Sequence, residues 1–228
     1  YSDNINIPES GNGTPDILDE ARFELEWMMK MQASDGGAYH KVSCATFPGY
    51  VAPTAEKDEL IVTPVSSTAT ADFCASMALA AEFYEKYDKE FASKCMEAAK
   101  KAWAWLEANP NFVFKNPEDI VTGEYGDRTD KDERYWAAAQ MYRATKDEKY
   151  LSSLGKASEG LDWSTVGDYG NIALVTMNGI DKNSDAYKNA EKAIIGQADR
   201  MAGNVSASPY GSAITKYNWG SNMTIANA

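Results

Sequence analysis

The stretch SSTATADFCASMALAAEFYEKYDKEFASKCMEAAKKAWAWLEA, residues 66–108, decides the fold. Its first part, residues 66–87, combines many alanines with large apolar side chains at helical spacing, which indicates an inner helix that packs closely. Its second part, residues 89–108, has an apolar face and a lysine-rich face, and the helix ends before Pro110. The two parts therefore predict a helical hairpin with a short turn.

Helical periodicity recurs on both sides of this hairpin. Upstream, residues 14–32 predict a helix with Pro15 in its first turn, acidic residues near its start and an apolar stripe. Downstream, further helices are expected at residues 130–142, 148–157, 166–179, 186–201 and 219–228. The predicted fold class is all-α, with about eight helices arranged as helical hairpins that stack side by side.

The connections carry little sign of β structure. Residues 39–64 contain three prolines and predict a long irregular connection, and long loops in compact domains are often functional. The one candidate β element is a short hairpin near Phe112 and Ile120.

Composition excludes several classes of protein. A formal net charge of −12 argues against phosphate contacts with DNA or RNA, because the field would repel a polyanion. No window approaches the roughly 20 apolar residues of a membrane-spanning helix. The single histidine excludes any Ser-His-Asp or multi-histidine zinc site that needs two imidazoles. Three cysteines without a close pair do not indicate a disulfide framework. Carboxylates and abundant aromatic residues remain, which fits an uncharged partner, and the length favours one domain, residues 1–228.

One string in the N-terminal part is specific: residues 6–20 read NIPESGNGTPDILDE. It resembles glycoside hydrolase family 9, the endoglucanase and cellulase family. Further matching strings follow in the family's order, and together they span nearly the whole chain. They are DGGAYHKV at 35–42, SSTATADF at 66–73, GEYGD at 123–127, DERYWAAA at 132–139, SPYG at 208–211 and WGSN at 219–222.

The resemblance implies an (α/α)6 barrel, built from twelve helices, with an open cleft for β-1,4-glucan. It also implies secretion and hydrolysis that inverts the anomeric carbon. Eight helices would then form a partial toroid, and such an open arc is expected to self-associate through its uncovered apolar faces. Inverting hydrolysis needs an acid and a base whose carboxyl groups lie about 6.5–9.5 Å apart.

The family's catalytic motifs do not occur in this sequence. The base lies in an Asp-Ala-Gly-Asp motif N-terminal to residues 6–20, and the acid lies in an Asn-Glu pair beyond residues 219–222. Glu9 and Glu124 match neither carboxylate. We therefore assign no catalytic residue to this chain and expect it to be inactive alone. It is either the central portion of a normal catalytic domain, which we favour, or a natural homologue that binds carbohydrate or has only a structural role.

Four residues are candidate glucan contacts. Trp219 matches a position where the family places an aromatic platform under a glucose ring, although a core tryptophan is an equal alternative. Tyr210 and Tyr125 lie in the matching cleft-side loops. His40 could hydrogen-bond a sugar hydroxyl as a neutral imidazole, although histidines that stabilise a loop are more common.

Four carboxylates precede or open the helix expected at 130–142. Asp132 and Glu133 match a pair with which relatives bind calcium, and Asp127 and Asp130 are added because they are close in sequence. The alternative is that acidic residues simply favour a helix N-terminus. We expect structural Ca²⁺ here.

Overall fold

The computed structural model describes residues 2–110, 112–217 and 220–227. These residues fall into two compact units, residues 1–130 and residues 131–228. Among the described residues, eight α-helices occur, which confirms the all-α prediction. None of these helices combines the length and the apolar character that crossing a membrane requires.

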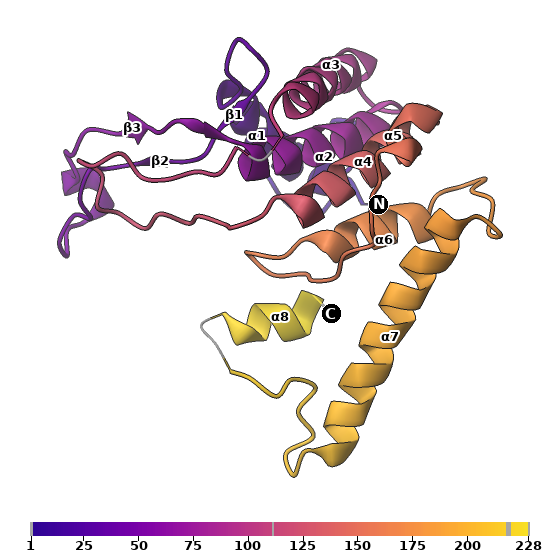
Figure 1. Ribbon diagram of the computed structural model, residues 1–228. Coiled ribbons are helices and arrows are strands. Elements are labelled where there is room, and N and C mark those ends of the chain that lie inside the picture. Colours follow the sequence, from indigo (N-terminus) through magenta and orange to yellow (C-terminus); the bar gives the residue numbers. More distant parts are fainter. Residues whose placement is uncertain (1, 111, 218–219, 228) are drawn as a thin grey trace. The chain divides into compact units, whose positions relative to one another are not determined.

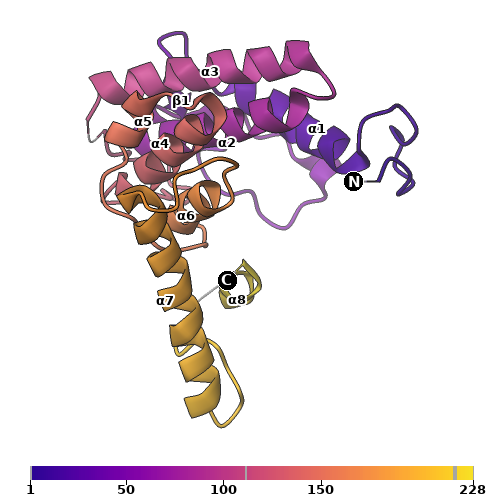
Figure 2. The same ribbon diagram turned by 90° about the vertical axis from the view of Figure 1, so that its right-hand side faces the viewer.

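The first unit is built on the hairpin of α2 (Ser67–Tyr84) and α3 (Lys89–Ala108), which lie along one another in Figure 2. The inner helix α2 is buried on most of its surface, because its alanines let α3 approach closely. Side chains cap both helices: Ser66 Oγ accepts from Ala69 N, and the Asp88 carboxylate accepts from Phe91 N.

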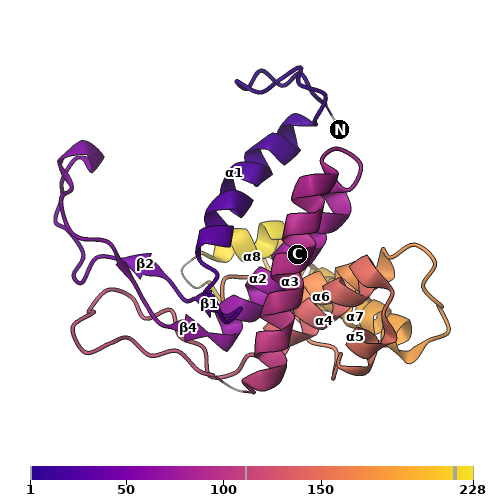
Figure 3. The ribbon, with the colours of Figure 1, turned by 90° about the horizontal axis from the view of Figure 1, so that it is seen from above.

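Helix α1 (Asp16–Lys30) runs beside α2 in the view of Figure 3 and contacts it. The Tyr84 hydroxyl, at the end of α2, donates to the Leu18 carbonyl of α1. The buried Asp16 carboxylate accepts from Ile5 N at 2.5 Å and from Ser10 Oγ at 2.9 Å. Asp16 thereby fixes the glycine-containing N-terminal segment to the first turn of α1.

Short strands organise the connection between α1 and α2. The strand β1 (Ala38–Tyr39) pairs antiparallel with β4 (Val65–Ser66). The strand β2 (Val42–Ser43) pairs antiparallel with β3 (Ile61–Val62), beyond the 3-10 turn η1 (Pro53–Ala55). This two-stranded ribbon is drawn in Figure 1.

The connection over residues 39–64 is irregular apart from these short strands and η1, whereas the expected hairpin near Phe112 and Ile120 was wrong. No strand occurs among the described residues from 112 to 130. Instead, Ser67 N donates to the Phe112 carbonyl at 3.0 Å, and Val121 N donates to the Ala45 carbonyl at 2.8 Å. Apart from a turn in which Ile120 N donates to the Pro117 carbonyl, these backbone hydrogen bonds join the segment to distant parts of the unit.

The second unit contains α4 (Lys131–Thr145), α5 (Glu148–Ser152), α6 (Gly167–Val175), α7 (Asp185–Ala207) and α8 (Ser221–Asn227). Helix α6 packs against both α4 and α7, and Figure 1 shows α7 extending well past α6. The close packing of α6 depends on Gly170, because a Cβ there would lie 2.7 Å from the Tyr135 ring. Compared with the predicted boundaries, α5 ends earlier, at Ser152, and α7 continues to Ala207.

Candidate functional site

The segment after β1 forms a clamp on the loop that carries Tyr125. One ring nitrogen of His40, Nδ1, lies 2.8 Å from Ser66 Oγ, and the other, Nε2, lies 3.1 Å from the Tyr125 carbonyl oxygen. The His40 ring also stacks on Phe114, with ring centroids 3.9 Å apart and planes inclined by 11°. These contacts join the N-cap of α2 to the loop after α3.

The hydrogen bonds show which ring nitrogen of His40 carries the proton when the ring is neutral. A carbonyl oxygen only accepts, so Nε2 carries the proton, and Nδ1 can accept from the Ser66 hydroxyl. Burial lowers the pKa of His40 below its ordinary 6.5, while the backbone bond with Tyr125 acts in the opposite direction. The neutral imidazole predicted from the sequence is therefore favoured, but both nitrogens are already engaged within the chain.

Lys41 completes the clamp on the same loop. Its Nζ donates to Thr122 Oγ1 at 3.1 Å and to the Gly123 carbonyl, and it lies 5.6 Å from the centroid of the Tyr125 ring. Tyr125 has a φ of 52°, in the left-handed region that non-glycine residues rarely adopt. Its side chain remains 60% exposed. The clamp thus holds an accessible aromatic ring in an uncommon backbone conformation.

The neighbouring carboxylate of Glu124 has a structural partner. Its Oε2 accepts from Asn116 N at 3.0 Å, and the residue is exposed. Glu9 is also exposed, in the loop before α1. That neither residue is catalytic stays a prediction.

The remaining predicted glucan contacts are Tyr210 and Trp219. Tyr210 belongs to the second unit, follows α7 and is 95% exposed, with its backbone N 3.3 Å from Ser208 Oγ. Trp219 lies outside the described residues. The assignment of all four residues to glucan binding stays a prediction.

The predicted calcium ligands fall on both sides of the division between the units. In the first unit, the Asp127 carboxylate accepts from Arg128 N and Thr129 N, and Asp130 is buried. In the second unit, Asp132 is buried and its Oδ2 accepts from Val166 N at 3.0 Å, and Glu133 is buried as well.

Carboxylate oxygens are ligands that Ca²⁺ prefers, so Asp132 and Glu133, which are both buried in the second unit, fit a calcium ion chemically. Calcium binding stays a prediction.

Asp168 is a buried carboxylate that the sequence analysis missed. It lies in the first turn of α6, is 1% exposed, and accepts from Gly160 N and from Asn171 Nδ2, each at 2.8 Å. Asn171 in turn donates to the Ser158 carbonyl and accepts from the Tyr135 hydroxyl. Nothing in the local sequence distinguishes Asp168 from an ordinary acidic residue near a helix start, because its bond to Gly160 N depends on how the preceding loop folds onto α6.

Comparisons with known proteins agree on one family. The family model described as "Glycosyl hydrolase family 9" matches residues 2–228. Endoglucanase D of Acetivibrio thermocellus is 36% identical, and the match covers 97% of this chain but 37% of that protein. A xyloglucan-specific endo-beta-1,4-glucanase of Bacteroides ovatus is 42% identical over 64% of this chain and 27% of its own length.

Solved structures give the same result. A thermostable endoglucanase from Alicyclobacillus acidocaldarius superposes with a TM-score of 0.87 at 32% identity, covering 95% of this chain and 43% of that one. The solved structure of "Bacteroides ovatus GH9" superposes with a TM-score of 0.82 at 32% identity, covering 92% of this chain and 42% of that one. The chain therefore spans less than half the length of each of these relatives.

Proposed function

The chain belongs to glycosyl hydrolase family 9, and we propose on that premise that the protein carrying it is an endo-β-1,4-glucanase that cleaves cellulose-like β-1,4-glucan. The observation that carries the proposal is the family match over residues 2–228, together with endoglucanase relatives of which the chain covers a continuous part. The solved relatives are (α/α)6 barrels, so the helical hairpins seen here are a part of that fold.

The chain's own contribution is proposed to be substrate binding. The exposed ring of Tyr125 offers an apolar face on which the C–H face of a glucose ring can stack. His40 supports this role through its bond to the Tyr125 carbonyl, so its contribution to glucan binding would be to hold the platform still. Tyr210 and Trp219 are proposed as further stacking residues on the strength of the motifs in which they occur.

The reaction itself needs groups that we do not find among the residues of this chain. Inverting hydrolysis uses one carboxylic acid to protonate the leaving oxygen and one carboxylate to activate water. Neither Glu9 nor Glu124 lies in a motif that matches the family's acid or base. The proposed catalytic pair therefore lies outside residues 1–228.

Hydrolysis of a soluble β-1,4-glucan tests the proposal directly. The 228-residue chain and the product of the complete gene are assayed side by side with Ca²⁺ present, and activity in the longer protein alone is the expected result. Binding without turnover by the longer protein would favour an inactive carbohydrate-binding homologue. Turnover by the 228-residue chain would mean that carboxylates described above as structural are catalytic.

Calcium and secretion are parts of the same proposal. The buried oxygen donors Asp132 and Glu133 support a structural Ca²⁺ ion, with Asp127 and Asp130 as further candidates. Secretion follows from the proposed substrate, because a long polysaccharide outside the cell can be reached only by an exported enzyme.

Self-association is proposed for the isolated chain. Helix α1 exposes Phe23 to 78%, together with Ile17 and Trp27, and exposed apolar groups of this size favour association. Sedimentation velocity should show a dimer or larger species that Phe23→Ser weakens. A monomer at high concentration would contradict the proposal.

A further inference from the structure

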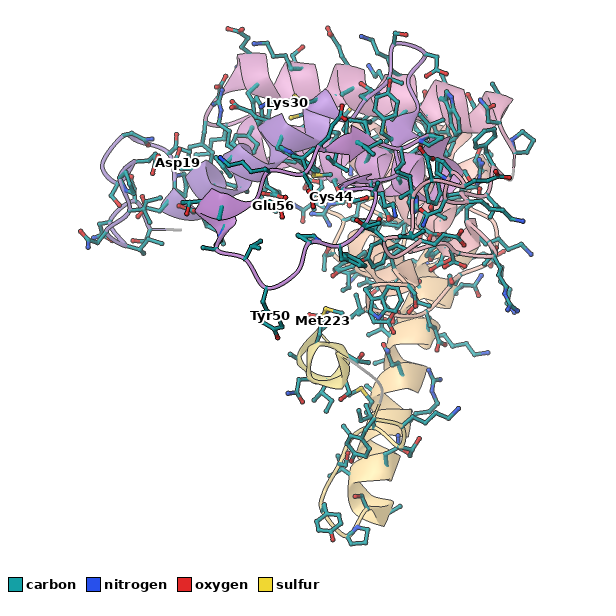
Figure 4. All side chains as sticks on the ribbon, turned by 90° about the vertical axis from the view of Figure 1, so that its left-hand side faces the viewer. Asp19, Lys30, Cys44, Tyr50, Glu56 and Met223 are labelled. Carbon is teal, nitrogen blue, oxygen red and sulfur yellow. The ribbon has the colours of Figure 1, made fainter. Side chains whose placement is uncertain are left out.

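Three side chains with different donor atoms converge at the base of the loop between β2 and β3. The ligand atoms of Cys44, Glu56 and Asp58 all lie within 4.8 Å of one another. Cys44 follows β2 directly, and the two carboxylates follow the 3-10 turn η1. Figure 4 shows Cys44 and Glu56 near each other, with Tyr50 at the far end of the loop pointing away.

The Glu56 carboxylate gives a second, independent sign of a ligand. Its Oε1 accepts from Asp58 N at 2.6 Å, which fixes the orientation of the group. Its Oε2 has essentially no contact with solvent and no hydrogen-bond partner in the structure. Glu56 as a whole is part-buried, and a carboxylate oxygen withdrawn from water without a donor or cation is unfavourable, so Oε2 is available to bind a metal ion.

We propose that Cys44, Glu56 and Asp58 form a binding site for a divalent zinc-type cation. A thiolate with two carboxylates suits a borderline-soft ion such as Zn²⁺, whereas Ca²⁺ and Mg²⁺ prefer oxygen alone. Three protein ligands leave the fourth tetrahedral position for water. The thiol loses its proton to solvent when the sulfur binds the metal, and no electron transfer is involved.

Such a site would fasten the loop at its base. The metal would join the end of β2 to the segment after η1, so the intervening residues form a closed loop whose ordering no longer depends on backbone pairing alone. That loop carries the exposed side chains of Phe47, Tyr50 and Val51, which contact little of the chain. The role of the ion is therefore structural, and it is independent of glucan hydrolysis and of the acidic residues at 127–133.

Zinc titration of the 228-residue chain tests the site. The titration is done in excess Ca²⁺, so that oxygen-only sites are occupied beforehand. We expect one equivalent of Zn²⁺ to bind, with affinity at least tenfold lower in Cys44→Ser and in Glu56→Gln. Glu59→Gln is the matched control, because Glu59 is an exposed carboxylate of the same loop outside the cluster. Its affinity should equal that of the unmodified chain.

Cobalt supplies a readout that non-specific carboxylate binding cannot imitate. Co²⁺ should give a near-ultraviolet charge-transfer band from the Cys44 thiolate, and Cys44→Ser should lack it. Asp58→Asn serves as a second variant, because Asp58 is exposed and its loss should leave the helices intact, as circular dichroism would verify. Absence of the band in the unmodified chain, or equal zinc affinity in Cys44→Ser, would overturn the proposal.

Discussion

His40 is the only histidine of the sequence, and its burial makes it a sensor of pH. The folded-state pKa is lowered below 6.5, so below that pH the unfolded chain binds a proton that the folded chain resists binding. Stability contributed by His40 is therefore complete above about pH 6.5 and is lost as the pH falls toward the folded-state pKa. We expect the free energy of unfolding to decrease from about pH 7 to pH 5.5.

Two measurements check this expectation. Proton NMR of the single imidazole should give a titration midpoint below 6.5 in the folded chain. Urea unfolding of His40→Gln, which cannot titrate, should show a flatter dependence on pH over the same window. A midpoint above 6.5 would contradict the effect assigned to burial.

Tyr125 should carry a measurable part of glucan binding. Tyr125→Ala in the longer, hydrolytic protein is expected to raise KM roughly tenfold, which corresponds to about 1.4 kcal/mol. Gly123→Ala should have a similar effect without removing the ring, because the added Cβ would lie 2.7 Å from Tyr125 Cζ and displace it.

The matched control is Tyr50→Ala, since Tyr50 is exposed in the same unit and has no assigned glucan contact. An equal rise in KM for Tyr50→Ala would show that any exposed tyrosine serves, and the assignment to Tyr125 would fail.

At the scale of elements, two helical glycines have opposite roles. In α6, Gly170→Ala would push a methyl group into the Tyr135 ring, so we expect a loss of about 1–3 kcal/mol. In α7, Gly203 has nothing within 4 Å of the added Cβ, so Gly203→Ala should stabilise by about 0.5–1 kcal/mol through helix propensity. Urea unfolding midpoints measure both, and a shift in the same direction would contradict the packing described for α6.

The helices could be predicted because their signals are local. Helix α3 illustrates this, since its periodic apolar face and the following Asn109-Pro110 define residues 89–108 without knowledge of any contact. The two-residue strands could not be predicted, because each is too short to show an alternating pattern. Val42 pairs with Val62, which is distant in sequence. The wrong hairpin near Phe112 fails for the same reason: its backbone finds partners at Ser67, far away in sequence.

The site was predictable only as a set of residues. The sequence singled out His40 and Tyr125 separately. In the structure, Nε2 of His40 lies 3.1 Å from the carbonyl oxygen of Tyr125. Lys41, which completes the clamp, was not singled out, because a lysine carries no local sign that it will reach Thr122 and Gly123. The buried Asp168 was missed because burial is a property of the tertiary structure and not of the local sequence.

For the whole molecule, calcium should couple to stability. A bound ion stabilises the folded chain by about 2.7 kcal/mol when its free concentration is a hundredfold above Kd. We expect added Ca²⁺ to raise Tm, and this rise should vanish in Asp132→Asn and in Glu133→Gln. Asp119→Asn removes an exposed carboxylate outside the predicted set and should keep the full response. If Ca²⁺ does not change the Tm of the unmodified chain, the calcium prediction is wrong and these carboxylates only stabilise the helix N-terminus.

The loop between β2 and β3 has a consequence for how a protein of this kind can acquire new parts. Gly49 at its tip is exposed and has open space around it, and the paired strands hold the two ends of the loop side by side. A foreign module whose own ends lie close together could be spliced in at Gly49 at a modest entropic cost, leaving the helical hairpin beneath undisturbed. The tip is thus a suitable point for domain insertion, where a module can be added by evolution or by protein engineering without changes to the helices.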